Sequence, residues 1–482
     1  MLAALYIRAK LCRKNTILLQ TQNVKRNLVY NYKLRCCVRQ FLVEGRDMSM
    51  KPVNVGLLGL GTVGAGVARV FISHREELEE KIGAPLALRA IADLDITNPR
   101  KGLTLDTLPL TTDPAAVLDE PSIDIVVELI GGLEPARSFI LRALANGKHV
   151  VTANKALLAT HGEELYEEAR RRGLMLAFEA AVAGGIPLIR SVKEGLVANR
   201  FTSLYGIVNG TSNYILSKMT DEGQEFARVL AEAQAKGYAE ADPTYDVEGI
   251  DSAHKLQILA TLAFRTSVKL KDIYVEGISK ITPEDIALAR EMGFRIKLLA
   301  IAKAANESLE LRVHPTMIPA DSPMSAVSGV FNAIFLNGDV VNDLMFYGRG
   351  AGQMPTASSV WADIVEIARR LAAGQSAVPQ DLPVLGRKPL ALKPMEEVLS
   401  AYYLYVSALD QPAVLAQVAG ILGNHGISIA SVIQKTRQHA KAVPVVMMTH
   451  EAVEGSMRRA LGEMDALRVI VAPTRMIRVE SS

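Results

Sequence analysis

Cysteine is scarce in this chain of 482 residues, and its three copies, Cys12, Cys36 and Cys37, all lie near the amino terminus. The rest of the sequence therefore offers no disulfide framework, no thiolate metal site and no cysteine nucleophile. Long apolar runs are missing as well, and a membrane span would need about 20 consecutive apolar residues. These absences exclude a disulfide-stapled fold and a membrane-spanning helix. The length of 482 residues predicts a globular protein of two or three domains.

The net charge of +3 hides an uneven distribution. Residues 1–51 carry eleven Lys and Arg against two Asp and Glu, which leaves a net charge of −6 for the remainder. A mildly acidic body argues against a nucleic-acid surface. We expect residues 1–50 to be a basic leader outside the fold, either disordered or not translated, with the true start at Met48 or Met50. A transit peptide is the alternative.

A glycine-rich turn follows the first predicted strand. Residues 53–58 are typical of a buried strand, Gly59-Leu60-Gly61-Thr62-Val63-Gly64 comes next, and a helix is expected from Ala65. Between a strand and a helix, this spacing is the dinucleotide fingerprint, in which N–H groups at the helix start bind the phosphates. It predicts a Rossmann-type, doubly wound α/β domain. The expected cofactor contacts are Gly59, Gly61, Thr62, Val63 and Gly64.

Two features near the predicted sheet edge bear on the cofactor and the chemistry. Asp93 follows a strand at 86–92, where an acid usually binds the ribose of NAD. Arg100 and Lys101 could instead bind the 2′-phosphate of NADP, so we expect NAD(P)H and leave the preference open. A later strand, 149–152, delivers Lys155 to the carboxyl edge of the sheet, which faces the ligand crevice.

An acidic segment lies between residues 233 and 255, and a helix begins within it. On that helix Asp251 and Lys255 are four residues apart, so they share one face. An acidic loop beside a lysine could hold a substrate ammonium and move a proton. The pattern Ala233-x-x-x-Gly237-Tyr238-Ala239, then Asp242-Pro243-x-x-Asp246-Val247-x-Gly249-x-Asp251-x-x-x-Lys255, resembles the signature of homoserine dehydrogenases.

The resemblance implies reversible reduction of L-aspartate 4-semialdehyde to L-homoserine, on the route to threonine, methionine and isoleucine. It implies that Lys255 donates the proton, with Lys155 as a second candidate for proton transfer and for cofactor contact. Asp251 would orient the substrate or its water, and Glu240 would bind the substrate ammonium. The pocket would also contain Gly210, Thr211, Tyr238 and Asp246. The chain departs from some family members at Thr244-Tyr245, where they carry a second acid.

Residues 179–187 are a turn of small residues, and their spacing by itself indicates a close backbone approach. In the family the matching segment binds a monovalent cation, sodium or potassium. The implied ligands are Glu179, Val182, Gly184 and Ile186. A second glycine-rich turn, at 342–355, implies in the same way that Gly350 contacts the cofactor.

The middle of the chain predicts an α+β domain with an open, mixed sheet. We expect β-type segments at 203–208, 270–280 and 308–313, with a helix at 283–304. In the family this sheet pairs with that of a partner chain, which implies a homodimer or homotetramer. The last eighty residues predict the order βαββαβ, the ferredoxin-like arrangement. With Asp410-Gln411-Pro412 at the first turn they resemble an ACT domain, which implies feedback inhibition by L-threonine. A purely oligomerising module is the alternative.

These patterns together predict a nucleotide domain at 51–185 plus 355–372 and a substrate and dimerisation domain at 186–354. A linker at 373–399 and an ACT domain at 400–482 would follow. We expect a cytoplasmic enzyme, with organelle targeting by the basic leader as the alternative. Its partners would be small molecules, without nucleic acid or membrane. The rival functions are a dehydrogenase of another substrate and a non-enzymatic sensor of nucleotides and amino acids.

Overall fold

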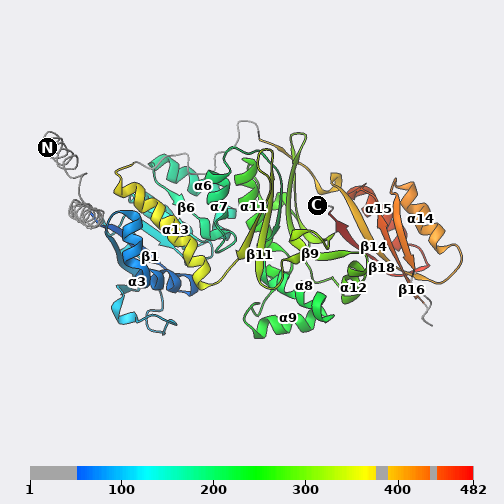
Figure 1. The fold of residues 1–482 in the computed structure, drawn as a ribbon, viewed down its shortest axis with the longest axis horizontal. Coiled ribbons are helices and arrows are strands. Elements are labelled where there is room, and N and C mark those ends of the chain that lie inside the picture. Colours follow the sequence, from blue (N-terminus) through cyan, green and yellow to red (C-terminus); the bar gives the residue numbers. More distant parts are fainter. Residues whose placement is uncertain (1–50, 376–388, 435–441, 481–482) are drawn as a thin grey trace, which may run out of the picture. The chain divides into compact units, whose positions relative to one another are not determined.

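The computed structural model describes residues 51–375, 389–434 and 442–480 (Figure 1). The chain divides into two units, Met1–Lys51 and Pro52–Ser482, and the second is described below. The expectations for the leader and for the middle of the linker, 376–388, lie outside the described residues. Within those residues, no helix combines the length and the apolar character that crossing a lipid bilayer requires.

Six parallel strands form the nucleotide-type sheet, in the order β3-β2-β1-β4-β5-β6. The strands are β1 (Val53–Leu58), β2 (Leu86–Ala92), β3 (Leu110–Thr111), β4 (Ile125–Glu128), β5 (His149–Thr152) and β6 (Leu176–Ala177). Strands β1, β4 and β5 are buried along their whole length, as strands covered on both faces must be. This sheet confirms the predicted doubly wound fold.

Helices cover both faces of this sheet. One hydrophobic cluster joins the sheet to α3 (Thr62–Ile82) and α13 (Gln353–Ala372), and another joins it to α4 (Ala115–Leu118), α5 (Ala136–Ala145) and α6 (Lys155–Arg172). Helix α13 comes from far along the chain and lies beside α3 in Figure 1. The indole of Trp361 donates to the Val67 carbonyl oxygen at 3.0 Å and stacks on Phe71, which fixes α13 against α3.

A mixed sheet forms the middle of the chain, in the order β12-β11-β7-β9-β10. The strands are β7 (Phe201–Ile207), β9 (Phe294–Ala305), β10 (Ser308–Pro319), β11 (Phe331–Gly338) and β12 (Asn342–Arg349), with β8 (Tyr274–Val275) and β13 (Ala391–Leu392) paired to β10. The helices of this part are α7 (Leu188–Arg190), α8 (Gly210–Glu222), α9 (Phe226–Ala235), α10 (Thr244–Val247), α11 (Ile250–Phe264) and α12 (Pro283–Glu291).

The helix predicted at 283–304 is wrong in its second half. Helix α12 ends at Glu291, Gly293 has a φ of 82°, and the chain returns as β9. Strand β9 pairs with β10 over its whole length and with β7 on its other side. Its apolar run suits a buried helix or a central strand equally well, so the neighbouring strands decide the outcome. Residues 342–349 are likewise strand β12, and the glycine-rich turn begins only after it.

The carboxyl-terminal part has the predicted βαββαβ order. It consists of β14 (Leu399–Leu409), α14 (Val414–Asn424), β15 (Ile429–Gln434), β16 (Ala442–Thr449), α15 (Glu454–Asp465) and β18 (Ile470–Val479), with the short β17 (Ala452–Val453) before α15. Its sheet is continuous with the middle sheet, because β18 pairs with β10 at Thr316–Arg478 and Met317–Val479. The buried Arg312 also binds Glu480 at 2.7 Å. The ACT domain predicted at 400–482 is therefore joined to the middle sheet through β18 and Glu480.

Candidate active site

The turn from β1 into α3 has the geometry that a phosphate site needs. Gly59 has a φ of 97°, and a Cβ there would lie 2.8 Å from the Leu129 carbonyl oxygen. A Cβ at Gly64 would lie 2.0 Å from the carbonyl oxygen of Gly59, whereas one at Gly61 would meet open space. Gly61 precedes the first turn of α3, so its open side leaves room for a ligand near the N–H groups of the helix start.

A pocket of about 290 Å³ opens at this turn. Its wall includes Gly59, Gly61, Asp93, Leu129 and Phe139, so it lies at the carboxyl ends of β1, β2 and β4. This edge contains the point between β1 and β4 where the strand order reverses, the usual ligand position in such sheets.

Asp93 and Arg100 lie together beside the glycine turn. Asp93 accepts hydrogen bonds from the main-chain N–H groups of Leu60 and, at 2.8 Å, Asp95. Arg100 donates to the Leu60 carbonyl oxygen at 3.0 Å, and its guanidinium lies 4.0 Å from Asp93. The two groups that the sequence offered as alternatives for the ribose end of the cofactor therefore share one location.

A hydrogen-bond network rigidifies the adjacent sheet edge. Glu128, fully buried at the end of β4, accepts from the N–H groups of Ile130 (2.8 Å) and Gly131 (3.1 Å) and from the hydroxyl of Thr152 (2.6 Å). Asn154 caps α6 by accepting from the Leu157 N–H, and its amide donates to the Gly132 carbonyl oxygen at 2.7 Å. These bonds hold the loop after β4 against the start of α6, where Lys155 is the first residue.

Lys155, Asp251 and Lys255 meet where the nucleotide-type sheet faces α11. Asp251 Oδ2 lies 2.7 Å from Lys255 Nζ, and Asp251 Oδ1 lies 3.2 Å from Lys155 Nζ. Lys255 also donates to the Val208 carbonyl oxygen at 2.6 Å. The carboxylate thus lies between two ammonium groups that come from different layers of the molecule, α6 and α11.

The three side chains of this cluster differ in their exposure to solvent. The side chain of Asp251 is 5% exposed, that of Lys255 is 11% and that of Lys155 is 35%. Burial favours the neutral acid, but the two ammonium groups outweigh it and hold the pKa of Asp251 well below its usual range. The carboxylate therefore stays ionised and fixes the position of both lysines.

Asn209 joins Asp251 to the acidic loop. Its amide nitrogen donates to Asp251 Oδ2 at 2.8 Å and to Asp246 Oδ1 at 2.7 Å, while its oxygen caps α8 by accepting from the Ser212 N–H. A second bond ties α8 to this loop, because the Ser212 hydroxyl donates to the Asp246 carbonyl oxygen at 2.9 Å. One helix start thereby orients two of the predicted carboxylates.

The outer part of the acidic loop is open to solvent. Glu240 is exposed, and Tyr238 is 45% exposed with its ring 5.0 Å from that of Tyr214. The hydroxyl of Thr211 donates to the Tyr238 carbonyl oxygen at 2.6 Å. Gly210 lies at the start of α8, where a Cβ would approach the Val330 carbonyl oxygen to 3.0 Å. The structure therefore links Asp246 to the lysine cluster through Asn209 but leaves Glu240 on the surface, at the rim of the site.

A buried histidine lies next to the cluster. Tyr245 and His254 are hydrogen-bonded, with the hydroxyl 2.9 Å from Nδ1. Burial lowers the pKa of His254, the nearby Asp251 opposes this shift and Lys155 reinforces it. Burial also raises the pKa of Tyr245 to about 12, and Asp251 and Asp246 act in the same direction. Tyr245, one of the two residues at which this chain departs from some family members, thus packs against His254.

The small-residue turn at 179–187 lies against α13. The Glu179 carboxylate accepts from the N–H groups of Ile189 and Arg190, each at 2.8 Å, so it caps the short helix α7. Ala183 and Gly184 have φ values of 59° and 52°, and a Cβ on Gly184 would lie 2.4 Å from the Gly350 carbonyl oxygen. Gly350 therefore packs against the segment predicted to bind a cation.

Comparison with known proteins matches three consecutive parts of the chain to family models. Residues 59–179 match the NAD-binding domain of homoserine dehydrogenase, 187–365 match homoserine dehydrogenase, and 402–467 match the ACT domain. A homoserine dehydrogenase from Pseudomonas aeruginosa is 48% identical over 89% of this chain and 99% of its own length. The chain belongs to the homoserine dehydrogenase family. It is accordingly an oxidoreductase of a CH–OH group with a nicotinamide-binding domain.

Solved structures of the family agree with this assignment. A homoserine dehydrogenase from Thiobacillus denitrificans is 47% identical and superposes with a TM-score of 0.83, covering 90% of this chain and 99% of that one. A hyperthermophilic archaeal homoserine dehydrogenase solved in complex with NADPH is 25% identical with a TM-score of 0.56, covering 66% of this chain and 98% of that one. The similarity to homoserine dehydrogenases stated from the sequence is confirmed.

Sequence reasoning missed several polar residues of this candidate site. Asn209 was visible as a residue before a helix, but its bonds to two distant carboxylates were not. The sequence placed three further polar residues, Glu128, Thr152 and Asn154, at the ends of strands or at the start of a helix. Such positions indicate a structural role, and nothing local in the sequence indicated that these residues adjoin the site. His254 adjoins Lys255 in the chain, and this position next to a predicted functional lysine was the available signal.

Proposed function

We propose that this protein interconverts L-aspartate 4-semialdehyde and L-homoserine with NAD(P)H, as a step in the synthesis of threonine, methionine and isoleucine. One observation carries the proposal: Asp251 binds Lys255 and Lys155 together at the edge of the nucleotide-type sheet. A bound nicotinamide nucleotide supplies or accepts the hydride, so the protein must supply position, charge and a proton.

Lys255 is the proposed proton donor to the aldehyde oxygen during reduction. Two of its N–H groups are directed to Asp251 and the Val208 carbonyl oxygen, which fixes the ammonium and leaves its third N–H for the substrate oxygen. During oxidation the same amine takes the hydroxyl proton. Lys155 is the second candidate, because its ammonium lies on the other oxygen of the same carboxylate.

The acidic loop supplies the proposed contacts to the amino-acid end of the substrate. Asp251 holds the lysines and orients the substrate or its water, and Asp246 lies beside it through Asn209. Glu240 is exposed at the rim and would reach the substrate ammonium as the substrate enters. Gly210, Thr211 and Tyr238 form the adjoining wall.

A spectrophotometric assay tests this function against its rivals. The full chain is incubated with L-homoserine and NADP⁺ or NAD⁺, and the absorbance of the reduced cofactor is followed. We expect turnover with L-homoserine and at least tenfold less with L-serine or L-threonine, because the acidic loop fixes the distance from ammonium to hydroxyl. Preferred oxidation of another hydroxy or amino acid would indicate a different dehydrogenase, and cofactor binding without turnover would indicate a sensor.

The surroundings of the glycine turn support a preference for NADP. Both oxygens of Asp93 already accept main-chain N–H groups, which reduces their capacity for ribose hydroxyls. Arg100 lies beside them and carries a positive charge suited to a 2′-phosphate. Its guanidinium now binds Asp95 at 3.3 Å, so the phosphate would take the place of that carboxylate. The archaeal relative solved with NADPH is consistent with this preference.

The turn at 179–187 would hold a monovalent cation through oxygen atoms. Because the Glu179 carboxylate caps α7, the available donors are main-chain carbonyl groups of Glu179, Val182, Gly184 and Ile186. Carbonyl oxygens on a strained, glycine-containing turn fit a hard cation such as sodium or potassium. The Gly184 carbonyl also accepts from Ser359 at 2.6 Å, which fixes its direction. The cation would support the contact between this turn and α13.

The ACT domain would make the enzyme subject to inhibition by L-threonine. Its sheet continues into the middle sheet through the pairing of β18 with β10, so a structural change at an effector site would be transmitted through paired strands toward the acidic loop. A shortened chain ending before the domain would expose the buried Arg312, which now binds Glu480. Point variants in the full chain therefore test inhibition better than truncation, and an unchanged rate at saturating L-threonine would reject it.

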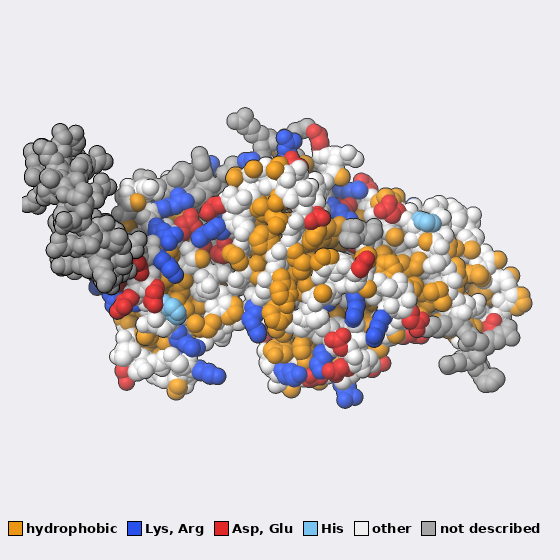
Figure 2. Space-filling view, in the orientation of Figure 1, with side chains coloured by type: hydrophobic (Ala, Val, Ile, Leu, Met, Phe, Trp, Pro, Cys, Tyr) orange, Lys and Arg blue, Asp and Glu red, His pale blue; other side chains and the backbone are white. Residues whose placement is uncertain are grey.

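The open face of the middle sheet supports a homodimer or homotetramer. Figure 2 shows hydrophobic side chains gathered over the region of β11 and β9. Tyr347 is 55% exposed there, and Phe331, Phe335 and Met345 are partly buried. Light scattering of the full chain tests the oligomeric state, and a monomer at micromolar concentration would contradict it. We keep a cytoplasmic location within this proposal, with organelle targeting by residues 1–50 as the alternative.

A further inference from the structure

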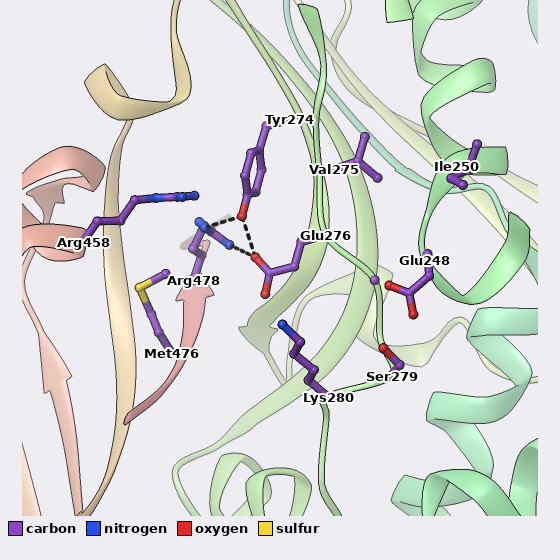
Figure 3. A pocket seen from close by; sticks show the side chains of 11 residues that line it. Glu248, Ile250, Tyr274, Val275, Glu276, Ser279, Lys280, Arg458, Met476 and Arg478 are labelled. Atoms are coloured by element: carbon purple, nitrogen blue, oxygen red, sulfur yellow. Dashed lines mark hydrogen bonds and ion pairs between the residues drawn. The ribbon is translucent and has the colours of Figure 1, made fainter. Parts of the chain in front are cut away.

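A second cavity lies between the middle sheet and the ACT domain. Its volume is about 650 Å³, within the range of small-molecule sites. One wall is the segment from β8 to Lys280, a second is β18 and α15, and a third is the start of α11 (Figure 3). Three parts of the fold that are distant in the sequence therefore meet around one space.

The inner wall of this cavity is a fixed ion-pair network. Arg478 is 1% exposed and donates to Glu454 at 2.9 Å and to Glu276 at 2.8 Å. Arg458 binds Glu454 at 2.9 Å, and its guanidinium lies 5.2 Å from the centre of the Tyr274 ring. Because these groups hold one another, they give the cavity a rigid, charged floor.

The outer wall adds charges of both signs that face the same space. Lys280 is exposed, and Figure 3 shows its side chain pointing toward Glu276 and Arg478. Glu248 lies on the opposite side, with its carboxylate so close to Gly277 that a Cβ there would come within 2.4 Å of it. Ile250 and Met476 contribute apolar surface. The cavity therefore offers cations, carboxylates and an apolar patch within one volume.

We propose that this cavity binds a free α-amino acid. A zwitterion needs a cation for its carboxylate and an anion for its ammonium, and either charge by itself would meet repulsion from half of the wall. Lys280 and Arg458 would bind the carboxylate, Glu248 and Glu276 the ammonium, and the apolar patch would contact the side chain. The chemistry fits the product L-homoserine and an end product such as L-threonine equally, so the experiment separates them.

The cavity wall is connected directly to the catalytic cluster. The N–H of Ile278 donates to the Val247 carbonyl oxygen at 2.8 Å, and Gly277 packs on Glu248. Helix α11 begins at Ile250, and Asp251 is the next residue. An amino acid that draws Glu248 and Lys280 together would therefore shift the start of α11 and the carboxylate that holds both lysines.

A third cavity, at the turn from β14 to α14, is the competing location for an effector. Its volume is about 580 Å³, and among the described residues that line it Asp410 is the one with a charged side chain. The two cavities can be filled separately, because Ser279 lines the first and Ala416 lines the second.

The experiment is calorimetric titration of L-threonine into the full chain and four variants. We expect Lys280→Ala to weaken binding at least tenfold, the usual effect of losing a hydrogen bond to a charged group, and Ser279→Trp to abolish it. Lys271→Ala, which removes an exposed lysine of the preceding turn, and Ala416→Trp should leave binding unchanged. Acetate and methylammonium, which each carry one of the two charges, should bind at least tenfold more weakly than the amino acid.

The kinetic arm uses L-homoserine and identifies the source of the ligand. If the product fills the cavity, high L-homoserine inhibits its own oxidation and Lys280→Ala removes this inhibition. The proposal is overturned if neither amino acid responds to Lys280→Ala and Ser279→Trp, or if Ala416→Trp abolishes binding while they do not. The inference rests on the proposed function for this kinetic arm alone. Calorimetry needs no turnover, so an inactive enzyme that still binds would reject the function and leave the site.

Discussion

Replacing Lys255 by methionine separates the two candidate proton donors. The side chain is 11% exposed, so the ammonium acts where water is largely excluded, and methionine keeps most of its volume. Loss of a general acid typically lowers turnover about 10²–10⁴-fold, equivalent to about 3–5 kcal/mol of barrier. We expect kcat of Lys255→Met to fall by this factor at pH 7.

The same substitution should disturb folding and cofactor binding much less. Asp251 keeps the ammonium of Lys155 at 3.2 Å and the Asn209 amide at 2.8 Å, so its buried charge remains compensated. We expect a loss of about 1–3 kcal/mol in unfolding free energy, below the 3–5 kcal/mol that an uncompensated buried charge costs. Lys255 lies on α11, away from the glycine turn, so the Kd for NADPH should stay within about threefold of the original.

The assay compares Lys255→Met with Lys155→Met and with Lys271→Met, an exposed control lysine in the same part of the chain. Initial rates of homoserine oxidation, NADPH fluorescence titration and thermal unfolding are measured for each. If Lys155→Met loses more turnover than Lys255→Met while NADPH binding is retained, the assignment is reversed. Equal rates for all three variants would refute general acid catalysis by either lysine.

Three further substitutions test the electrostatics. The pKa of Asp251 is lowered in the folded state, so its carboxylate stabilises the protein at pH values above 3.8, its ordinary pKa, and this stabilisation is lost as pH falls. In urea unfolding, Asp251→Asn should therefore lower the free energy of unfolding at pH 7 and lower it progressively less below pH 4. Burial and the Glu179 carboxyl raise the pKa of Asp363 to about 8, so the free energy of unfolding should fall as pH rises from 4 to 8. Asp363→Asn should remove this pH dependence, and a variant that keeps it would contradict the assignment to Asp363. Arg100→Ala should raise KM for NADPH at least tenfold and leave KM for NADH within about twofold, whereas equal effects would exclude 2′-phosphate recognition.

The sequence was informative wherever a local pattern carries the chemistry. The glycine turn at 59–64 needs positive φ at one position and open space at another, and both requirements are visible as glycines. Asp251 and Lys255 share a face because a helix brings residues four apart together. The order of strands and helices in the last eighty residues followed from alternation and turns. These features depend on neighbours in the chain, so they could be predicted without coordinates.

Prediction from the sequence failed where contacts with residues far away in the chain determine the structure. Residues 294–305 are apolar enough for a buried helix, and they form a strand because β7 and β10 supply hydrogen bonds on both sides. Asn209 caps α8, and its amide also joins two carboxylates that lie 37 and 42 residues away in the chain. No local pattern records such a pairing.

The sequence by itself determined the family and the nucleotide turn, and it predicted which side chains react, because each depends on residue types at short, fixed spacings. Tertiary structure decided that one carboxylate, Asp251, lies between lysines from two helices, and that the sheet of the ACT domain continues into the middle sheet. It also decided that a charged cavity lies where these parts meet. The reason is physical: ion pairs, strand pairing and cavities depend on distances in space, and those distances follow from packing of the whole chain.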